Sequence, residues 1–277
     1  MTGLLGEFIL PGTSPWLFWS FVLTGVIIQG ISKSGFAGGA GILSLPMMML
    51  VMPVDRVPAV LLPLLILFDM NAVYHHRHNK DLRLVKTIFF PSLIGTALAT
   101  WVWYKVGKEG VGEYGGYIKQ FTGVIAILFA AYIFAKETSM KWVSGRKAGP
   151  GLGVVAGVAA GFTSTINHSA GPIVSLYMFS QNLGKSFFTG TVAWTFACIN
   201  LSKLPSYAGL GLIDYSVLKF DLLLLPLIPL GSWIGKWMHH NVSERAFNWV
   251  IFVLTVIASV HLVFGVNLVS LALGLVF

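Results

Sequence analysis

The chain has 277 residues, of which 56% are hydrophobic and only 10% are charged, and its mean hydropathy is +0.80. A chain of this composition has too little polar surface to cover a soluble globule, so we predict a polytopic membrane protein. The net charge of +8 suggests nucleic acid as a partner in a soluble protein, but in a membrane protein Lys and Arg mark orientation, and we expect no nucleic acid.

The first residues, 1–15, carry Glu7 and lack the basic start of a signal peptide, so we interpret them as part of the mature protein. Several of the apolar runs that follow exceed the roughly 20 residues needed to cross a bilayer. In chain order, we expect helical segments at 15–31, 42–52, 57–74, 87–105 and 118–135, then at 151–166, 171–182, 186–207, 216–236 and 246–264. The fold class is therefore all-α, with two groups of about five helical segments.

A polar stretch separates the two groups. It is rich in Lys and Arg and ends in Gly149-Pro150, which is typical of a solvated loop that leads into a helix. We divide the chain into a first transmembrane repeat (16–135), a cytoplasmic linker (136–150), a second transmembrane repeat (151–264) and an apolar C-terminal tail (265–277).

Two Gly-rich breaks interrupt the apolar segments, the first from Gly30 to Pro46 and the second from Gly161 to Tyr177. Five pairs align without gaps, and two more follow after small shifts: Gly30/Gly161, Ser32/Thr163, Ile42/Ile173, Ser44/Ser175, Leu45/Leu176, then Asn71/Asn200 and Gly95/Gly231. This ordered set predicts an internal duplication. Backbone breaks at membrane depth must face protein or a polar cavity, and corresponding breaks in two halves point to a transporter's binding site.

Segments 42–52 and 171–182 are short, with only about 16 to 18 Å of helix each against a bilayer core of about 30 Å. We expect each to be a half-span, which forms either a re-entrant hairpin or two unequal spans with the segment before it. Both alternatives return the chain to the same side.

Loop parity then places 75–86, 136–150, 183–185 and 236–245 on one side, with eleven Lys and Arg against six on the other. The positive-inside rule makes the richer side cytoplasmic and puts both termini outside. Loop 75–86 has four basic residues while its second-half counterpart, 208–215, has none. This difference favours an inverted repeat, whose equivalent loops lie on opposite faces.

Lys33 is the sharpest candidate in the first break, because a charge near the centre of a helix costs about 2.5 to 3.5 kcal/mol without a partner or a polar cavity. A bound anion would compensate it; the alternative is that Lys33 reaches the cytoplasmic surface. The same break adds Ser34, and Gly38, Gly39 and Gly41 let backbone N–H groups approach a ligand, unless they serve close helix packing.

The second break offers Asn167, His168 and Ser169 as donors, and Gly171 begins a helix whose N-terminus favours an anion. It contains no carboxylate, so a neutral or anionic solute fits better than a cation. His168 is either a proton carrier or a neutral hydrogen-bonded histidine.

Near the ends of equivalent helices lie Asp69 and Asn71 in the first half and Asn200 and Lys203 in the second. We expect the two asparagines to cap or pin the broken segments. Asp69 is a candidate proton site or a partner for Lys33, although an interfacial position remains the alternative for Asp69 and Lys203.

No cofactor or metal ion is expected. His75, His76 and His78 are too close in sequence for helical ligand spacing, and the glycines at 38–41 lack the Lys-Ser/Thr of a phosphate loop. Cys198 is the only cysteine, which excludes a disulfide within the chain and a thiolate cluster. An intramembrane enzyme would need a nucleophile and base or metal ligands, and none is apparent.

A first helix that ends in Gly30-x-x-x-x-Gly35-Phe-x-Gly38-Gly39-x-Gly41, followed by Pro46, resembles the sulfite exporter TauE/SafE family of membrane anion transporters. The second half is similar to the family at Gly157-x-x-x-Gly161-Phe, Ala170-Gly171-Pro172, Gly190-Thr191 and Asn200-x-x-Lys203, and Pro91 with Gly95 resembles its mid-repeat helix. The resemblance covers residues 16–264 and implies export or uptake of small sulfur-containing or organic anions, such as sulfite or sulfoacetate, across the cell inner membrane.

We therefore predict a transporter that exports sulfite or an organosulfonate, with the two breaks facing each other near the midplane. Efflux of an anion from a negative interior is downhill by about 2.3 kcal/mol per charge per 100 mV, so no coupling ion is required. The alternative is proton-coupled uptake, or a channel-like pore, that uses Asp69 and His168. Expected partners are the small anion and the lipid bilayer, and the protein is a monomer or a homodimer.

Overall fold

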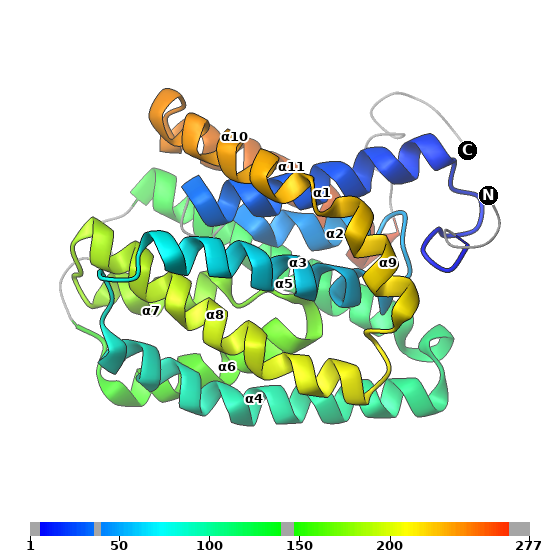
Figure 1. The fold of residues 1–277 in the computed structure, drawn as a ribbon, viewed down its shortest axis with the longest axis horizontal. Coiled ribbons are helices and arrows are strands. Elements are labelled where there is room, and N and C mark those ends of the chain that lie inside the picture. The colour runs from blue at the N-terminus through cyan, green and yellow to red at the C-terminus, as the bar shows by residue number, and fades with distance from the viewer. Residues whose placement is uncertain (1–5, 36–39, 140–146, 266–277) are drawn as a thin grey trace.

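The computed structural model describes residues 6–35, 40–139 and 147–265. Within these ranges every regular element is a helix, as the composition predicted, and the helices pack side by side with long axes near one common direction (Figure 1). The first half contains α1 (Pro15–Gly35), the 3-10 turn η1 (Ala40–Leu43), α2 (Ser44–Met48), α3 (Arg56–His75), α4 (Leu82–Glu109) and α5 (Val111–Ser139).

The second half repeats this order with one extra interruption. It contains α6 (Pro150–Asn167), α7 (Gly171–Ser180), α8 (Lys185–Gly209), α9 (Tyr215–Leu224), α10 (Leu227–Asn241) and α11 (Glu244–Phe264). By length and apolar composition, five helices among the described residues can cross a membrane, or six if the bent pair α9 and α10 is one span. The chain is a multi-pass membrane protein.

Three sequence predictions need correction. The first half-span is shorter than 42–52, because η1 and α2 together end at Met48. Helix α1 continues to Gly35, so Lys33 lies in its last turn and not in the break. The segment 216–236 is two helices that meet at a 46° bend. The cause of the bend is Pro226, whose ring removes a backbone N–H and clashes with the preceding turn.

The two halves pack on each other reciprocally. Helix α1 of the first half packs on α10 of the second, and α6 of the second half packs on α4 of the first. Glycines permit both contacts: a Cβ on Gly30 would lie 2.8 Å from Gly231 Cα, and a Cβ on Gly161 would collide with Ser92 O. Other inter-half pairs include α3 with α8, α4 with α8, and α5 with α11. Equivalent elements thus exchange partners between the halves.

Helices α3 and α8 lie side by side and run in opposite directions (Figure 1). At one end, Arg56 at the start of α3 donates to Asp214 just after α8. At the other end, Asn79 after α3 donates to Ser186 at the start of α8. Loop 76–81, the first turns of α8 and Lys236 therefore gather at one end of the molecule, while Arg56 and the turn 209–214 lie at the other.

Candidate functional site

A small cavity of about 20 Å³ lies between the two breaks, near the centre of the helix layer. Its lining comes from both halves: Gln29 and Lys33 from α1 and Gly41 from the first break, Ser164, His168 and Gly171 from the second break and its flanking helices, and Leu65, Phe196 and Asn200 from α3 and α8. A space of this size admits about one water molecule. The breaks therefore face each other across a closed polar space.

The first break is held by side chains of α1. Gly41 N–H donates to Ser32 Oγ at 2.8 Å, and Gln29 Nε2 donates to Gly41 O at 3.0 Å. A Cβ on Gly41 would collide with Gln29 Oε1, so a larger residue here would displace the Gln29 amide from this contact. The Gly41 N–H is thus not free for a ligand, contrary to the sequence prediction, because Ser32 already accepts from it.

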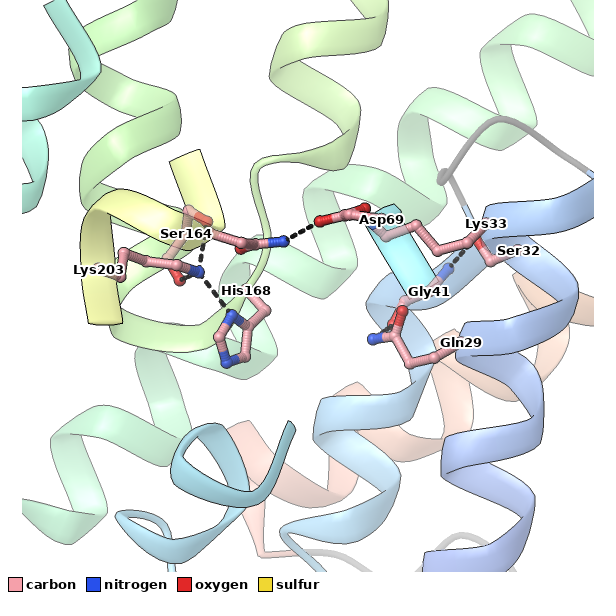
Figure 2. Close-up of polar contacts among 9 residues, drawn as sticks. Gln29, Ser32, Lys33, Gly41, Asp69, Ser164, His168 and Lys203 are labelled. Atoms are coloured by element: carbon pink, nitrogen blue, oxygen red, sulfur yellow. Dashed lines mark hydrogen bonds and ion pairs between the residues drawn. The ribbon is translucent and has the colours of Figure 1, made fainter. Parts of the chain in front are cut away.

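Lys33 and Asp69 form a buried ion pair beside this cavity. Lys33 Nζ lies 2.5 Å from Asp69 Oδ1, and their side chains are 9% and 1% exposed. The other carboxylate oxygen, Oδ2, accepts from Asn200 Nδ2 at 2.5 Å, so Asp69 links α1 to α8 (Figure 2). Lys33 Nζ also lies 4.2 Å from the centroid of the Phe196 ring, a cation–π contact.

The second break begins where α6 ends. His168 adopts the left-handed conformation, with φ of 53°, and its N–H donates to the carbonyls of Ser164 and Thr163. This conformation is uncommon outside glycine and persists where the surroundings fix it. The Thr165 carbonyl accepts from Tyr207 Oη at 2.7 Å and Trp103 Nε1 at 3.1 Å. These hydrogen bonds hold the last turn of α6 at a carbonyl in the stretch where the helix itself no longer provides donors.

Lys203 holds this turn in place with three hydrogen bonds. Its ammonium donates to Ser164 O at 3.0 Å, to Ser164 Oγ at 2.9 Å and to His168 Nδ1 at 2.8 Å (Figure 2). His168 Nε2 lies 2.9 Å from Pro58 O, and because a carbonyl only accepts, Nε2 carries the proton and Nδ1 accepts from Lys203. His168 is therefore a neutral histidine here, the second of the two alternatives.

The buried charges of this site do not cancel. Lys33 pairs with Asp69, whereas Lys203, fully buried, contacts only neutral acceptors. With His168 neutral, a protonated Lys203 leaves these groups with one positive charge in a desolvated place. Such an excess favours a negative ligand, because few charges compete and little water screens them.

The family model described as Sulfite exporter TauE/SafE matches residues 21–262. The chain belongs to the TauE/SafE family. Comparisons with curated proteins and with solved structures gave no match. Since proteins of this family are membrane transporters, the TauE/SafE assignment and the apolar helices together make the chain a transmembrane transporter suited to small anions.

The structure of this TauE/SafE protein brings five predicted site residues to one cavity: Lys33, Gly41, His168, Gly171 and Asn200. Two further predicted residues, Asp69 and Lys203, lie one hydrogen bond behind it. Asp69 is thus the partner of Lys33 that the sequence suggested, and both Asp69 and Lys203 are buried inside the protein.

Other predicted residues lie elsewhere. Asn71 donates to Ser232 Oγ at 3.3 Å and joins α3 to α10. Asn167 donates to Thr122 Oγ1 at 3.3 Å, towards α5, and Ser169 donates to the Asn167 carbonyl. Ser34 does not line the cavity, and Gly38 and Gly39 lie outside the described residues.

Sequence reasoning missed Gln29 as a site residue. It lies four positions before Lys33, one turn back on the same helical face, so helical spacing would have revealed it. Phe196 stands in the same relation to Asn200. Their signal was weak because an amide or a phenylalanine in an apolar helix usually belongs to packing.

Nothing in the described part of the chain forms a group of three or more His, Cys, Asp or Glu side chains able to hold a metal ion. The histidines after α3 serve other contacts: His75 Nδ1 lies 2.8 Å from Asn71 O, and its Nε2 lies 3.1 Å from Lys236 Nζ. The arrangement at the breaks suits reversible binding of an anion.

Proposed function

We propose that this protein exports a small sulfur-containing oxyanion, sulfite or an organosulfonate such as sulfoacetate, and binds it between the two breaks. The observation that carries this proposal is the convergence of Lys33, Asn200 and both backbone breaks on one cavity with an excess positive charge. Membership of a sulfite exporter family supports the choice of sulfite.

Each part of the site has a task in binding. Lys33 Nζ and Asn200 Nδ2 are N–H donors at the cavity wall, and oxyanion oxygens accept from such donors. Lys203 acts differently: its N–H groups are occupied by Ser164 and His168, so it contributes positive charge at a distance and holds the second break. A cavity of about 20 Å³ must widen to receive the anion, which requires the breaks to move apart.

Movement of one half against the other would supply this widening. Three features support an inverted repeat as its basis: the reciprocal packing of α1 and α6, the opposite directions of α3 and α8, and the contact between Asp69 and Asn200. Asp69 and Asn200 are 131 positions apart, the same offset as the aligned Gly30 and Gly161. By the positive-inside rule, the basic loops favour a cytoplasmic position for their end of the molecule, with both termini outside.

The first test removes the ammonium at the cavity. Lys33→Ala deletes a charge-assisted donor worth about 1.5 to 3 kcal/mol, so saturable sulfite flux into liposomes should fall by roughly 10- to 100-fold. Lys219→Ala is the matched control, because Lys219 is exposed and stacks on the Tyr215 ring far from the breaks. Its flux should equal that of the wild type.

A double variant separates binding from folding. Lys33→Ala alone leaves Asp69 buried without its cation, whereas Lys33→Ala combined with Asp69→Asn leaves no unpaired charge. Flux should stay low in the double variant. Recovery of sulfite flux in that variant would show that Lys33 only neutralises Asp69 and would remove it from the binding site.

A further inference from the structure

Asp69 occupies the donors that an entering anion requires. Its two carboxylate oxygens accept from Lys33 Nζ and Asn200 Nδ2, each at 2.5 Å. Both donor residues line the cavity, while Asp69 itself does not. In this closed structure the carboxylate is therefore an internal anion, bound by one donor from each half of the protein.

An oxyanion in the cavity competes with this internal anion. If Asp69 stays ionised, the two negative groups share a single lysine in a place with little solvent, and like charges at that distance repel strongly. If Asp69 takes up a proton, its need for both donors ends, and Lys33 and Asn200 become available to the ligand. Protonation of Asp69 and anion binding thus favour each other.

Among the charged and titratable groups around the cavity, Asp69 is the one that takes this proton. On α8, Cys198 and Lys203 lie close enough to interact electrostatically with Asp69, and Lys33 pairs with it from α1. At the second break His168 is neutral and its ring nitrogens are both engaged. Cys198 is half-buried and does not line the cavity.

The helices α9 and α10 also pack on α3. On α10, Lys236 contacts His75, well beyond Asp69 along α3. On α9, Asp221 is buried, and neither of its carboxylate oxygens has a hydrogen-bond partner among the described residues, so it is not bonded to Asp69. Asp221 therefore provides a second buried carboxyl for comparison.

We propose that Asp69 couples transport to protons: the protein binds one proton on Asp69 with each anion that it binds on Lys33 and Asn200. This coupling rests on the proposed function, since it requires the anion to bind between the breaks. Each transported anion then carries one negative charge fewer across the membrane. The proton gradient acts on transport together with the anion gradient. The membrane potential alone therefore drives export less strongly than we expected from the sequence for an anion that crosses without a proton.

Calorimetry of purified protein tests the coupling. Sulfite is titrated into wild type, Asp69→Asn and Asp221→Asn in two buffers of different ionisation enthalpy, between about pH 6 and about pH 8, which gives protons taken up per anion. The titration of sulfite itself is common to all three proteins and cancels in the comparison. The wild type should take up about one proton more than Asp69→Asn, and Asp221→Asn should match the wild type.

The affinities provide a second readout. Compared with Asp69→Asn, the wild type should lose up to about tenfold in sulfite affinity for each pH unit over which it takes up the additional proton on binding. If Asp69→Asn does not fold, the wild type alone still tests the coupling. The number of protons taken up on binding must then exceed the number that sulfite itself takes up by about one.

The possible failures are distinct. Equal proton counts in the wild type and Asp69→Asn, with sulfite bound by both, would overturn the coupling and leave the proposed function intact. Loss of the proton in Asp221→Asn and its retention in Asp69→Asn would also overturn it. Absence of sulfite binding by the wild type would refute the proposed function and this inference with it.

Discussion

Two buried lysines of this transporter have opposite surroundings. Lys33 has a carboxylate partner and lines the cavity, whereas Lys203 is fully buried and donates all three hydrogen bonds to neutral acceptors. A cation near the C-terminus of a helix is favoured by the backbone dipoles and by the carbonyls that lack helical partners. Lys203 thereby stabilises the end of α6 that the break exposes.

Replacement of Lys203 should affect stability more than the chemistry of binding. Lys203→Met leaves Ser164 O and His168 Nδ1 buried without a donor, at about 1 to 3 kcal/mol for each unsatisfied group. We expect a clearly lower thermal unfolding temperature in detergent, measured by intrinsic fluorescence. Lys219→Met, at an exposed position, should melt like the wild type; equal melting of both variants would contradict this role.

At this scale the sequence predicted the candidate site well where a residue type was unusual for its place. A lysine and a polar run in apolar helices identified Lys33 and His168, and both line the cavity. The ion pair between Lys33 and Asp69 was one of two alternatives, and only three-dimensional packing decides between them. Asn167 and Asn71 face other helices because side-chain direction depends on helix rotation, which composition does not define.

At the scale of elements, glycine controls how closely the halves approach. On α6, a Cβ at Gly161 would collide with the Ser92 carbonyl, and one at Gly157 would lie 2.5 Å from Ile88 O. Small residues at such crossings bring backbones together where lipid provides no hydrophobic drive for association. The contact between α4 and α6 therefore depends on the absence of side chains along one stripe of α6.

Gly161→Ala should separate α4 from α6. The added methyl group meets backbone, which cannot rotate away, so we expect a loss of about 1 to 3 kcal/mol in unfolding free energy. Gly151→Ala is the control on the same helix, since a Cβ there meets nothing within 4 Å and alanine is the better helix former. Denaturation of both variants in detergent measures the difference. A Gly151 variant as unstable as the Gly161 variant would refute the packing argument.

The helices themselves were predictable because apolar length is a strong signal, and most segments differ from the observed helices only at their ends. Interruptions were harder. The two Gly-rich breaks were found, but the bend at Pro226 was not, because the apolar run continues through this proline and prolines inside other helices, such as Pro63 and Pro91, do not end them. The early end of α2 at Met48 likewise lies inside an apolar stretch.

At the scale of the whole molecule, contacts between the halves close both ends. At the end of the basic loops, Asp81 N–H donates to Thr191 Oγ1, and Asn79 donates to Ser186. At the opposite end, Arg56 lies 2.6 Å from Asp214 and 3.2 Å from Glu7. Beside Arg56 lies a larger cavity, of about 430 Å³, lined in part by Trp103, Tyr104, Val106 to Lys108 and Gly209 to Leu212. Alternating access requires one set of contacts to open at a time.

The Asp214 carboxyl is not a pH switch near neutrality. Partial burial alone would raise its pKa, but the hydrogen bond and charge of Arg56 and the N–H of Val217 lower that pKa below its ordinary value. A carboxyl with a lowered folded-state pKa stabilises the structure above its unfolded-state pKa, about 4, and loses this contribution as pH falls through the lower value. Asp214 is thus ionised near neutral pH and would not imitate proton uptake by Asp69.

The Arg56–Asp214 contact should therefore act on the balance between closed and open states at this end. The pair is partly exposed and is worth up to about 1 kcal/mol, so Asp214→Asn should raise the open population by up to about fivefold. A cysteine at Leu65, which lines the central cavity, reports this as faster reaction with an impermeant maleimide in a Cys198→Ser background. Glu7→Gln is the matched control, because Glu7 contacts the same arginine without joining the halves. An equal increase in both variants would show that Arg56 needs only a nearby acid, and that its bridge to the second half does not hold this end closed.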